Sequence, residues 1–157
     1  MVPSTVALRP AAPADRDFLF RLYASTREEE LAIVPWPPEA KETFLRQQFE
    51  ARTRDYEARS AAADKAIVLR DGAPVGQIWV NRSQDELRVL DVALMPGHRR
   101  SGLGTSLLTG LLDEARERKV PVRLFVLADN PARRLYERLG FSAIGPAGAY
   151  QEMECRP

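Results

Sequence analysis

The sequence has only one cysteine, one histidine and almost no excess of charge, and it contains no long apolar run. Cys155 alone makes no intrachain disulfide, and with His98 it supplies too few ligands for a Cys/His metal cage, so we expect no metal. No apolar run approaches the length that spans a bilayer, and the first residues lack the features of a secretory signal. The net charge of +1 argues against a nucleic-acid partner, which would require a basic face. We therefore expect a cytoplasmic protein without a membrane or nucleic-acid partner.

The length and composition are those of a chain that can bury a core. Of its 157 residues, 45% are hydrophobic and 29% are charged, and we expect one domain over residues 1–157. The spacing of apolar residues predicts strands at 6–8, 66–69, 75–80, 87–94, 122–127, 141–144 and 150–154. Helices are predicted at about 13–26, around Phe44 to Tyr56, after Gly104 to about Lys119, and from Asn130 to Leu139. Residues 27–38 are predicted to be irregular.

A short loop rich in arginine and glycine joins the strand at 87–94 to the third helix. A helix start leaves backbone N–H groups unpaired and adds the positive end of its dipole, which favours a bound phosphate. Gly102 and Gly104 let that backbone approach a ligand closely. The loop is not a dinucleotide fingerprint, because Leu107 stands where the third glycine is required, and it lacks the Gly-Lys-Ser/Thr of a Walker loop.

Two segments together carry a family resemblance. Arg99-Arg100-Ser101-Gly102-Leu103-Gly104 fits the pattern Arg/Gln-x-x-Gly-x-Gly/Ala, and Leu94-Met95-Pro96 precedes it. Downstream, the run from Asn130 to Phe141 fits Asn…Ala…Leu-Tyr-x-x-x-Gly-Phe. From about Val75 onward the sequence resembles the GNAT superfamily of acyl-CoA-dependent N-acetyltransferases. The resemblance implies an α/β fold with a mixed antiparallel and parallel sheet of about seven strands and about four helices, its strands splayed at a CoA site.

The resemblance implies acetyl-CoA as the cosubstrate. The pyrophosphate would rest on N–H groups from Arg100 to Thr105, with the Thr105 hydroxyl and the Arg99 or Arg100 side chain beside it, although solvated arginines would look the same. The pantetheine arm would enter where the strand near Val92 to Leu94 leaves its neighbour, and pair with strand backbone. Asn130 resembles a cofactor-side asparagine and also suits a helix N-cap. The implied cofactor residues are Val92, Leu94, Arg99, Arg100, Ser101, Gly102, Leu103, Gly104, Thr105, Asn130, Arg133 and Tyr136.

The resemblance also assigns the chemistry of acyl transfer. The backbone N–H near Leu94 would polarise the thioester carbonyl, and Tyr136 would act as the acid for the departing thiolate. Tyr136 also shares a helical stripe with Leu135 and Leu139, a position that is equally suited to a core residue.

The sequence does not single out one residue as the general base. Many relatives carry a glutamate at positions that here are Arg88 and Phe125, so Asp91 is the nearest carboxylate that could relay a proton through water. An amine of low pKa would need no dedicated base. Arg88 could bind an acceptor carboxylate bidentately or could point outward. Trp36 could line the acceptor site or could belong to the core.

These residues favour an N-acetyltransferase that transfers an acetyl group to a primary amine of a small molecule or peptide in a direct ternary complex. The alternative is a domain that binds CoA or acyl-CoA as a sensor and turns over poorly. A homodimer is compatible with the resemblance, but no residue requires one.

Overall fold

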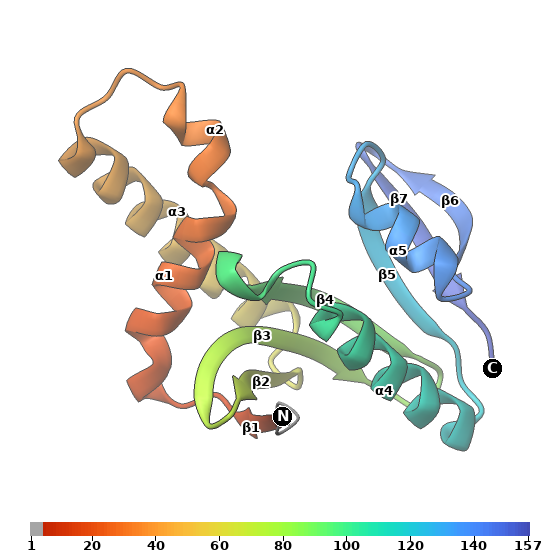
Figure 1. Ribbon diagram of the computed structural model, residues 1–157. Helices are drawn as coiled ribbons and strands as arrows, with labels where there is room; N and C mark the ends of the chain where they lie inside the picture. The colour runs from red at the N-terminus through yellow and green to blue at the C-terminus, as the bar shows by residue number, and fades with distance from the viewer. Residues whose placement is uncertain (1–4) are drawn as a thin grey trace. The chain divides into compact units, whose positions relative to one another are not determined.

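The computed structural model describes residues 5–157, which form seven strands and five α-helices (Figure 1). The contacts between residues divide the chain into two compact units. The first comprises the chain up to Gln77 together with Ala93–Gly97, and the second comprises Ile78–Val92 and His98–Pro157. Among residues 5–157, no helix has both the length and the apolarity needed to cross a bilayer. The prediction of a single domain stays a prediction.

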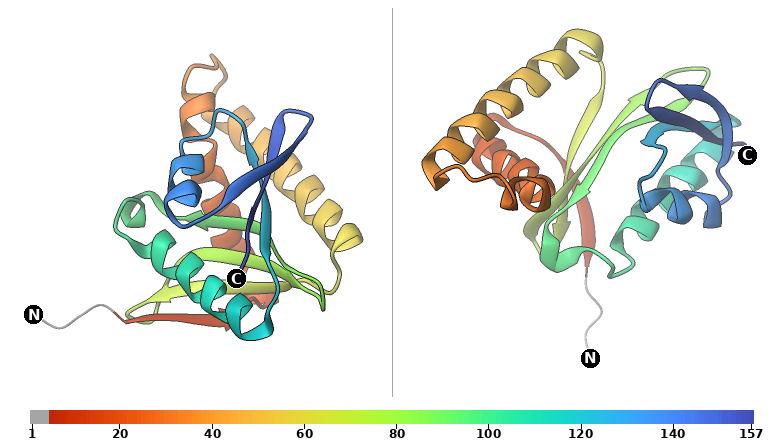
Figure 2. Two further views of the ribbon diagram at one scale, coloured as in Figure 1. Left: turned by 90° about the vertical axis from the view of Figure 1, so that its right-hand side faces the viewer. Right: turned by 90° about the horizontal axis from the view of Figure 1, so that it is seen from above.

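The first unit consists mainly of helices. Its elements are β1 (Val6–Pro10), the 3-10 segment η1 (Pro13–Asp15), α1 (Arg16–Thr26), α2 (Glu28–Ala32), α3 (Pro38–Arg59) and β2 (Asp64–Arg70). Helices α1 and α3 lie side by side (Figure 2), with the Phe20 and Phe49 ring centroids 5.6 Å apart. Tyr23 packs on Phe49 at 5.8 Å, and the Arg46 guanidinium carbon lies 4.1 Å from the Phe20 ring centroid. Aromatic packing with covering cations therefore holds this helix pair together.

The second unit contains the elements on which the predicted site depends. They are α4 (Leu103–Arg118), β5 (Val122–Leu127), α5 (Ala132–Arg138), β6 (Ser142–Ala147) and β7 (Tyr150–Cys155). Both α4 and α5 contact β5. The helix predicted after Gly104 is confirmed as α4, and it buries Leu107, Leu108, Leu111, Leu112 and Ala115.

The strands form one sheet in the order β1-β2-β3-β4-β5-β7-β6. The strands β3 (Ala73–Arg82) and β4 (Leu87–Leu94) run through both units, and the 3-10 segment η2 (Pro96–His98) follows β4. Strand β4 pairs in parallel with β5, whereas β5 with β7 and β6 with β7 are antiparallel. This mixed sheet with its helices confirms the predicted α/β fold class.

The prediction of an irregular segment between the first two helices was wrong in part. Residues 28–32 form α2, so the described chain has five α-helices rather than about four. Three consecutive glutamates occupy the first turn of this helix, where carboxylates are favourable beside the positive end of the dipole. Arg27 pairs with Glu30 one turn later. A five-residue helix is too short to give a clear periodic signal.

Asp15 joins the start of the first helical segment to β1. Its carboxylate accepts hydrogen bonds from both terminal nitrogens of Arg9, at 2.8 and 2.7 Å, and from the Ala12 backbone N–H at 2.7 Å. The Arg9 hydrogen bonds, followed by the one from Ala12, lower the pKa of Asp15 to about 2. The stability that this pair provides is therefore present above the ordinary aspartate pKa and is lost as the pH falls toward 2.

Gly76 on β3 lets the backbone approach β4 closely. A Cβ added there would lie 2.4 Å from the Ala93 carbonyl oxygen and 2.7 Å from Leu94 Cδ2. We expect Gly76→Ala to lower the free energy of unfolding by about 2 kcal/mol, the cost of overpacking a buried position. Gly110 in α4 is the matched control, because a Cβ there meets nothing within 4 Å, and Gly110→Ala should stabilise the helix by about 0.5–1 kcal/mol. Urea unfolding of both variants measures the difference; equal effects would contradict the close approach.

Candidate active site

The loop before α4 has a backbone that exposes donors at the helix start. Arg100 and Gly102 have positive φ angles of 57° and 82°, and a left-handed arginine costs about 1–2 kcal/mol that the loop must offset elsewhere. The Ser101 hydroxyl donates a hydrogen bond to the His98 carbonyl at 2.7 Å. No side chain caps the N-terminus of α4, so the N–H groups of its first turn have no side-chain acceptor and are oriented to bind an anion.

The residues of this loop divide by exposure. Leu103 is buried and anchors the helix start, whereas Arg99, Arg100 and Thr105 are exposed. A Cβ on Gly104 would meet nothing within 4 Å, so the surface beside that glycine is open. An open backbone surface with unpaired N–H donors fits the pyrophosphate of CoA.

The parallel pairing of β4 with β5 is short. Its register runs from Leu87 opposite Val122 to Val89 opposite Leu124. The residues that follow, 90–92 on β4 and 125–127 on β5, lie outside that register, although β5 continues to pair with β7 up to Leu127. The two strands therefore stop pairing before Val92, earlier than the predicted position, and the predicted splaying of the sheet is confirmed.

Tyr136 lies half-buried on α5, with its ring 5.7 Å from that of Phe141. Burial, followed by the negative charge of Asp91, raises the pKa of the Tyr136 hydroxyl above its ordinary value. The structure thus brings two predicted catalytic residues within electrostatic reach of each other. A phenol whose pKa exceeds that of a thiol is better suited to hydrogen-bond a developing thiolate than to transfer its proton fully.

Asn130 and Arg133 lie at the start of α5. The Asn130 Oδ1 accepts a hydrogen bond from the Ala132 N–H at 2.9 Å, so its side chain bonds a donor at the start of α5, although the N-cap position predicted for it is taken by Pro131. Arg133 donates to Glu137 at 3.2 Å and to the Ala128 carbonyl at 3.5 Å. The Asn130 side-chain amide, on an exposed residue, keeps its N–H donors for a further partner.

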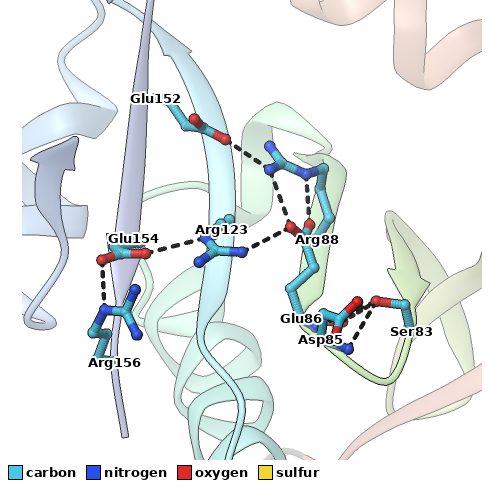
Figure 3. A network of polar contacts seen from close by, with 8 residues as sticks. All are labelled: Ser83, Asp85, Glu86, Arg88, Arg123, Glu152, Glu154 and Arg156. Carbon is cyan, nitrogen blue, oxygen red and sulfur yellow. Dashed lines mark hydrogen bonds and ion pairs between the residues drawn. The ribbon is translucent and has the colours of Figure 1, made fainter. Parts of the chain in front are cut away.

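Charged side chains from three strands form a network that the sequence did not predict (Figure 3). Arg88 on β4 donates to Glu86 from Nε at 2.7 Å and to Glu152 on β7 from Nη2 at 2.6 Å. Arg123 on β5 donates to Glu86 at 3.0 Å and to Glu154 at 3.1 Å. Because each of these side chains is only about 12–25% exposed, removing one partner would leave a partly buried charge uncompensated, which costs more than breaking an isolated surface pair.

Arg88 is held within this network rather than pointing outward. Its Nε and Nη2 face Glu86 as a fork, and its Cζ lies 4.8 Å from the Phe125 ring centroid. Its Nη1 is buried and makes no hydrogen bond to residues 5–157. The bidentate edge that we predicted for an acceptor carboxylate is thus occupied by Glu86, and substrate binding by Arg88 stays a prediction.

Two further predicted residues belong to the first unit. Leu94 ends β4, and the following Met95 N–H donates to the Val75 carbonyl at 2.8 Å. Trp36 is 46% exposed and packs edge-on against Phe44 at 5.6 Å. It lines an open groove of about 480 Å³ together with Glu39, Ala40, Thr43, Phe44 and Gln47. The groove keeps Trp36 accessible to a ligand, and the roles of both residues stay predictions.

No group of three or more potential metal ligands gathers within the part of the chain that the structure describes. The glutamates and Arg123 of the charge network were missed from the sequence. The sequence feature that could have indicated them is the two-residue spacing of charged residues, Glu86 with Arg88 and Glu152 with Glu154. Residues two positions apart on a strand project from the same face.

Comparison with known proteins identifies the family. Residues 19–141 match the acetyltransferase (GNAT) family. Over 94 residues, 54% of this chain, the sequence is 38% identical to the mycothiol acetyltransferase of Brachybacterium faecium, and this chain spans 28% of that relative's length.

Solved structures agree in fold. The PaiA N-acetyltransferase of Thermoplasma acidophilum, solved in complex with coenzyme A, has a TM-score of 0.73 at 18% identity, covering 98% of this chain and 99% of that chain. The ribosomal-protein-S18-alanine N-acetyltransferase of Escherichia coli has a TM-score of 0.64 at 22% identity, covering 97% and 94%. This chain therefore belongs to the acetyltransferase (GNAT) family, as its two motifs predicted.

Proposed function

We propose that this protein transfers the acetyl group of acetyl-CoA to a primary amine of a small molecule or peptide, in one complex with both substrates and without an acyl-enzyme. The observation that carries the proposal is the uncapped start of α4, where two left-handed residues and an open glycine present backbone donors. This arrangement suits a pyrophosphate, because anions bind at helix N-termini through N–H groups and the dipole.

The second unit offers a course for the rest of the cosubstrate. The N–H groups of Leu103, Gly104 and Thr105 would hold the phosphates, with Arg99 or Arg100 adding a cation. Backbone of residues 90–92, beyond the paired register, would hydrogen-bond the pantetheine amides as an added strand does. Asn130 would donate from its free amide to the same arm. When bound, acetyl-CoA supplies an activated acyl group and a thiolate leaving group.

The side chains near the thioester would act on charge as it develops. Tyr136 would donate a hydrogen bond to the sulfur as negative charge appears there, and water would then protonate the released thiolate. Its raised pKa keeps the hydroxyl protonated throughout the neutral range. Fixing the two substrates together supplies a further large share of the rate, up to about 7–11 kcal/mol of the barrier.

Release of thiol from acetyl-CoA across a panel of primary amines tests this function. The panel contains alkylamines, arylamines, amino acids and short peptides with free N-termini, and calorimetry with acetyl-CoA accompanies it. We expect binding of acetyl-CoA and amine-dependent thiol release with at least one class. Tight binding without amine-dependent release anywhere in the panel would support the alternative, a domain that senses CoA or acyl-CoA. Absence of binding would contradict both.

A further inference from the structure

The charge network of the second unit contains three glutamates, and one of them differs from the other two. Glu86 accepts hydrogen bonds on both carboxylate oxygens, from Arg88 and Arg123. Glu154 also uses both oxygens, with Arg123 and Arg156 as donors. Glu152 receives one hydrogen bond, on Oε2 from Arg88, and among residues 5–157 nothing donates to its Oε1. Glu152 therefore keeps one oxygen available.

The three glutamates also differ in the exposure of their side chains. The Glu152 side chain is 25% exposed, against 20% for Glu86 and 12% for Glu154, so Glu152 is the most accessible of the three. Burial opposes the ionisation of Glu86 and Glu154, but the arginine hydrogen bonds prevail and lower the pKa of each carboxyl. These two glutamates are therefore fixed as counter-ions of arginines and are poor proton acceptors.

The register places Glu152 beside the end of the β4–β5 pairing. Glu152 is the antiparallel partner of Phe125, and Phe125 is the first residue of β5 beyond the last pair, Val89 with Leu124. Glu154 faces Arg123, within that pairing, and Glu86 precedes its first residue, Leu87. Of the three carboxylates, Glu152 is thus the one beside the stretch where β4 and β5 no longer pair with each other.

The two faces of these strands carry different groups. Side chains alternate along a strand, so Arg88 and Asp91 project from opposite faces of β4. The charge of Asp91 acts on Tyr136, which lies on α5, a helix that contacts β5. Arg88 and Glu152 form an ion pair (Figure 3), and both lie with Phe125 on the other face. A thioester between the strands would have Tyr136 on one side and Glu152 on the other.

We infer that Glu152 is a catalytic residue that accepts a proton from the ammonium group of the acceptor, and that Arg88 is the positioning residue that orients it. The inference rests on the proposed acetyl transfer. One N–H bond of the ammonium breaks as Glu152 Oε1 takes the proton, and the freed nitrogen lone pair forms the C–N bond. The C–S bond breaks with its electron pair leaving on sulfur, the nitrogen loses a second proton to water, and water protonates the thiolate. Asp91, the base predicted from the sequence, lies on the Tyr136 side.

The test compares Glu152→Gln with Glu154→Gln, its neighbour two residues along the same strand and in the same network. Each variant is assayed with acetyl-CoA and two amines, phenethylamine, which is protonated at pH 7, and 4-methoxyaniline, which is neutral there. The charged groups around Glu152 are Arg88 from β4, Glu86 just before β4, Arg123 from β5, Glu154 from β7 and Arg156 just after β7. Thermal unfolding checks that both variants fold.

We expect Glu152→Gln to lower kcat/KM for phenethylamine by about 10²-fold at pH 7, the range of general-base catalysis. The loss should be regained as the pH rises, by about tenfold per unit, because a larger fraction of the amine then arrives neutral. With 4-methoxyaniline the same variant should stay within about threefold of the wild type. Glu154→Gln should behave as the wild type with both amines.

The outcomes separate this inference from the proposed function. Equal losses with both amines, or a loss in Glu154→Gln as large as in Glu152→Gln, would assign Glu152 a structural role and overturn the inference while acetyl transfer stands. A Glu152→Gln variant as active as the wild type would also overturn the inference. Wild-type protein that binds acetyl-CoA but acetylates neither these two amines nor any other in the panel would overturn the proposed function and the inference together.

Discussion

Gly104→Asp is expected to weaken the binding of CoA by about 10²–10³-fold while leaving the protein folded. The added Cβ meets nothing within 4 Å in the protein, so the fold has no steric reason to change. A carboxylate in the first turn of α4 is favourable beside the dipole and should add about 0.3–1 kcal/mol of stability. The same carboxylate would occupy the space proposed for the pyrophosphate and repel its charge.

Calorimetry measures the loss of CoA affinity, and thermal unfolding measures the change in stability. Gly110→Asp is the matched control, because it places the same side chain on the same helix, in equally open space, nearly two turns from the proposed phosphates. Its effect on affinity should be less than about threefold at physiological salt, where charges are screened over about 8 Å. Gly104→Asp with unchanged CoA affinity would rule out the start of α4 as the phosphate site.

Tyr136→Phe is expected to lower kcat by about 10²-fold without changing the affinity for CoA. The substitution removes only the hydroxyl, so the ring stays against Phe141. Loss of one donor to a developing charge in a site that excludes water has an effect of this size. Because burial and Asp91 raise the pKa of the hydroxyl, Tyr136 should stay protonated and add no alkaline limb to the rate below about pH 10.

The assay is thiol release with the amine that the wild type acetylates fastest. Tyr56→Phe on α3 is the control and should retain full kcat. An unchanged kcat in Tyr136→Phe would remove the tyrosine from the chemistry. A fall in kcat accompanied by an equal fall in CoA affinity would indicate that the hydroxyl binds the cosubstrate in the ground state rather than stabilising the leaving group.

The sequence predicted the elements of the fold where local signals are strong. The bounds of β4 and β5 agree with the predicted strands at 87–94 and 122–127, because each is an apolar run between clear turn signals. Asp71 and Gly72, which join the predicted strands at 66–69 and 75–80, both have positive φ angles, as an Asp-Gly hairpin turn requires. Helix α2 was missed because five residues form little more than one turn.

In the candidate site, too, features formed within one short segment were predicted from the sequence, whereas contacts between distant segments were not. The phosphate loop and the Asn130 hydrogen bond lie within single short segments, so their residue order alone indicates them. The Arg88–Glu152 pair joins positions 64 residues apart in the sequence. Its existence depends on the order of β4, β5 and β7 and on their register, and a shift of one residue would turn Glu152 to the opposite face. Spacing within one strand carries no information about that register.

We expect CoA to bind along the second unit, from the start of α4 to the stretch where β4 and β5 no longer pair with each other. Titration of isotope-labelled protein with CoA, followed by the backbone amide resonances, tests it most directly. The account predicts that the largest shifts occur at Leu103, Gly104 and Thr105 and at residues 90–92 and 125–127. No shift at millimolar CoA, or shifts confined to other parts of the chain, would contradict it.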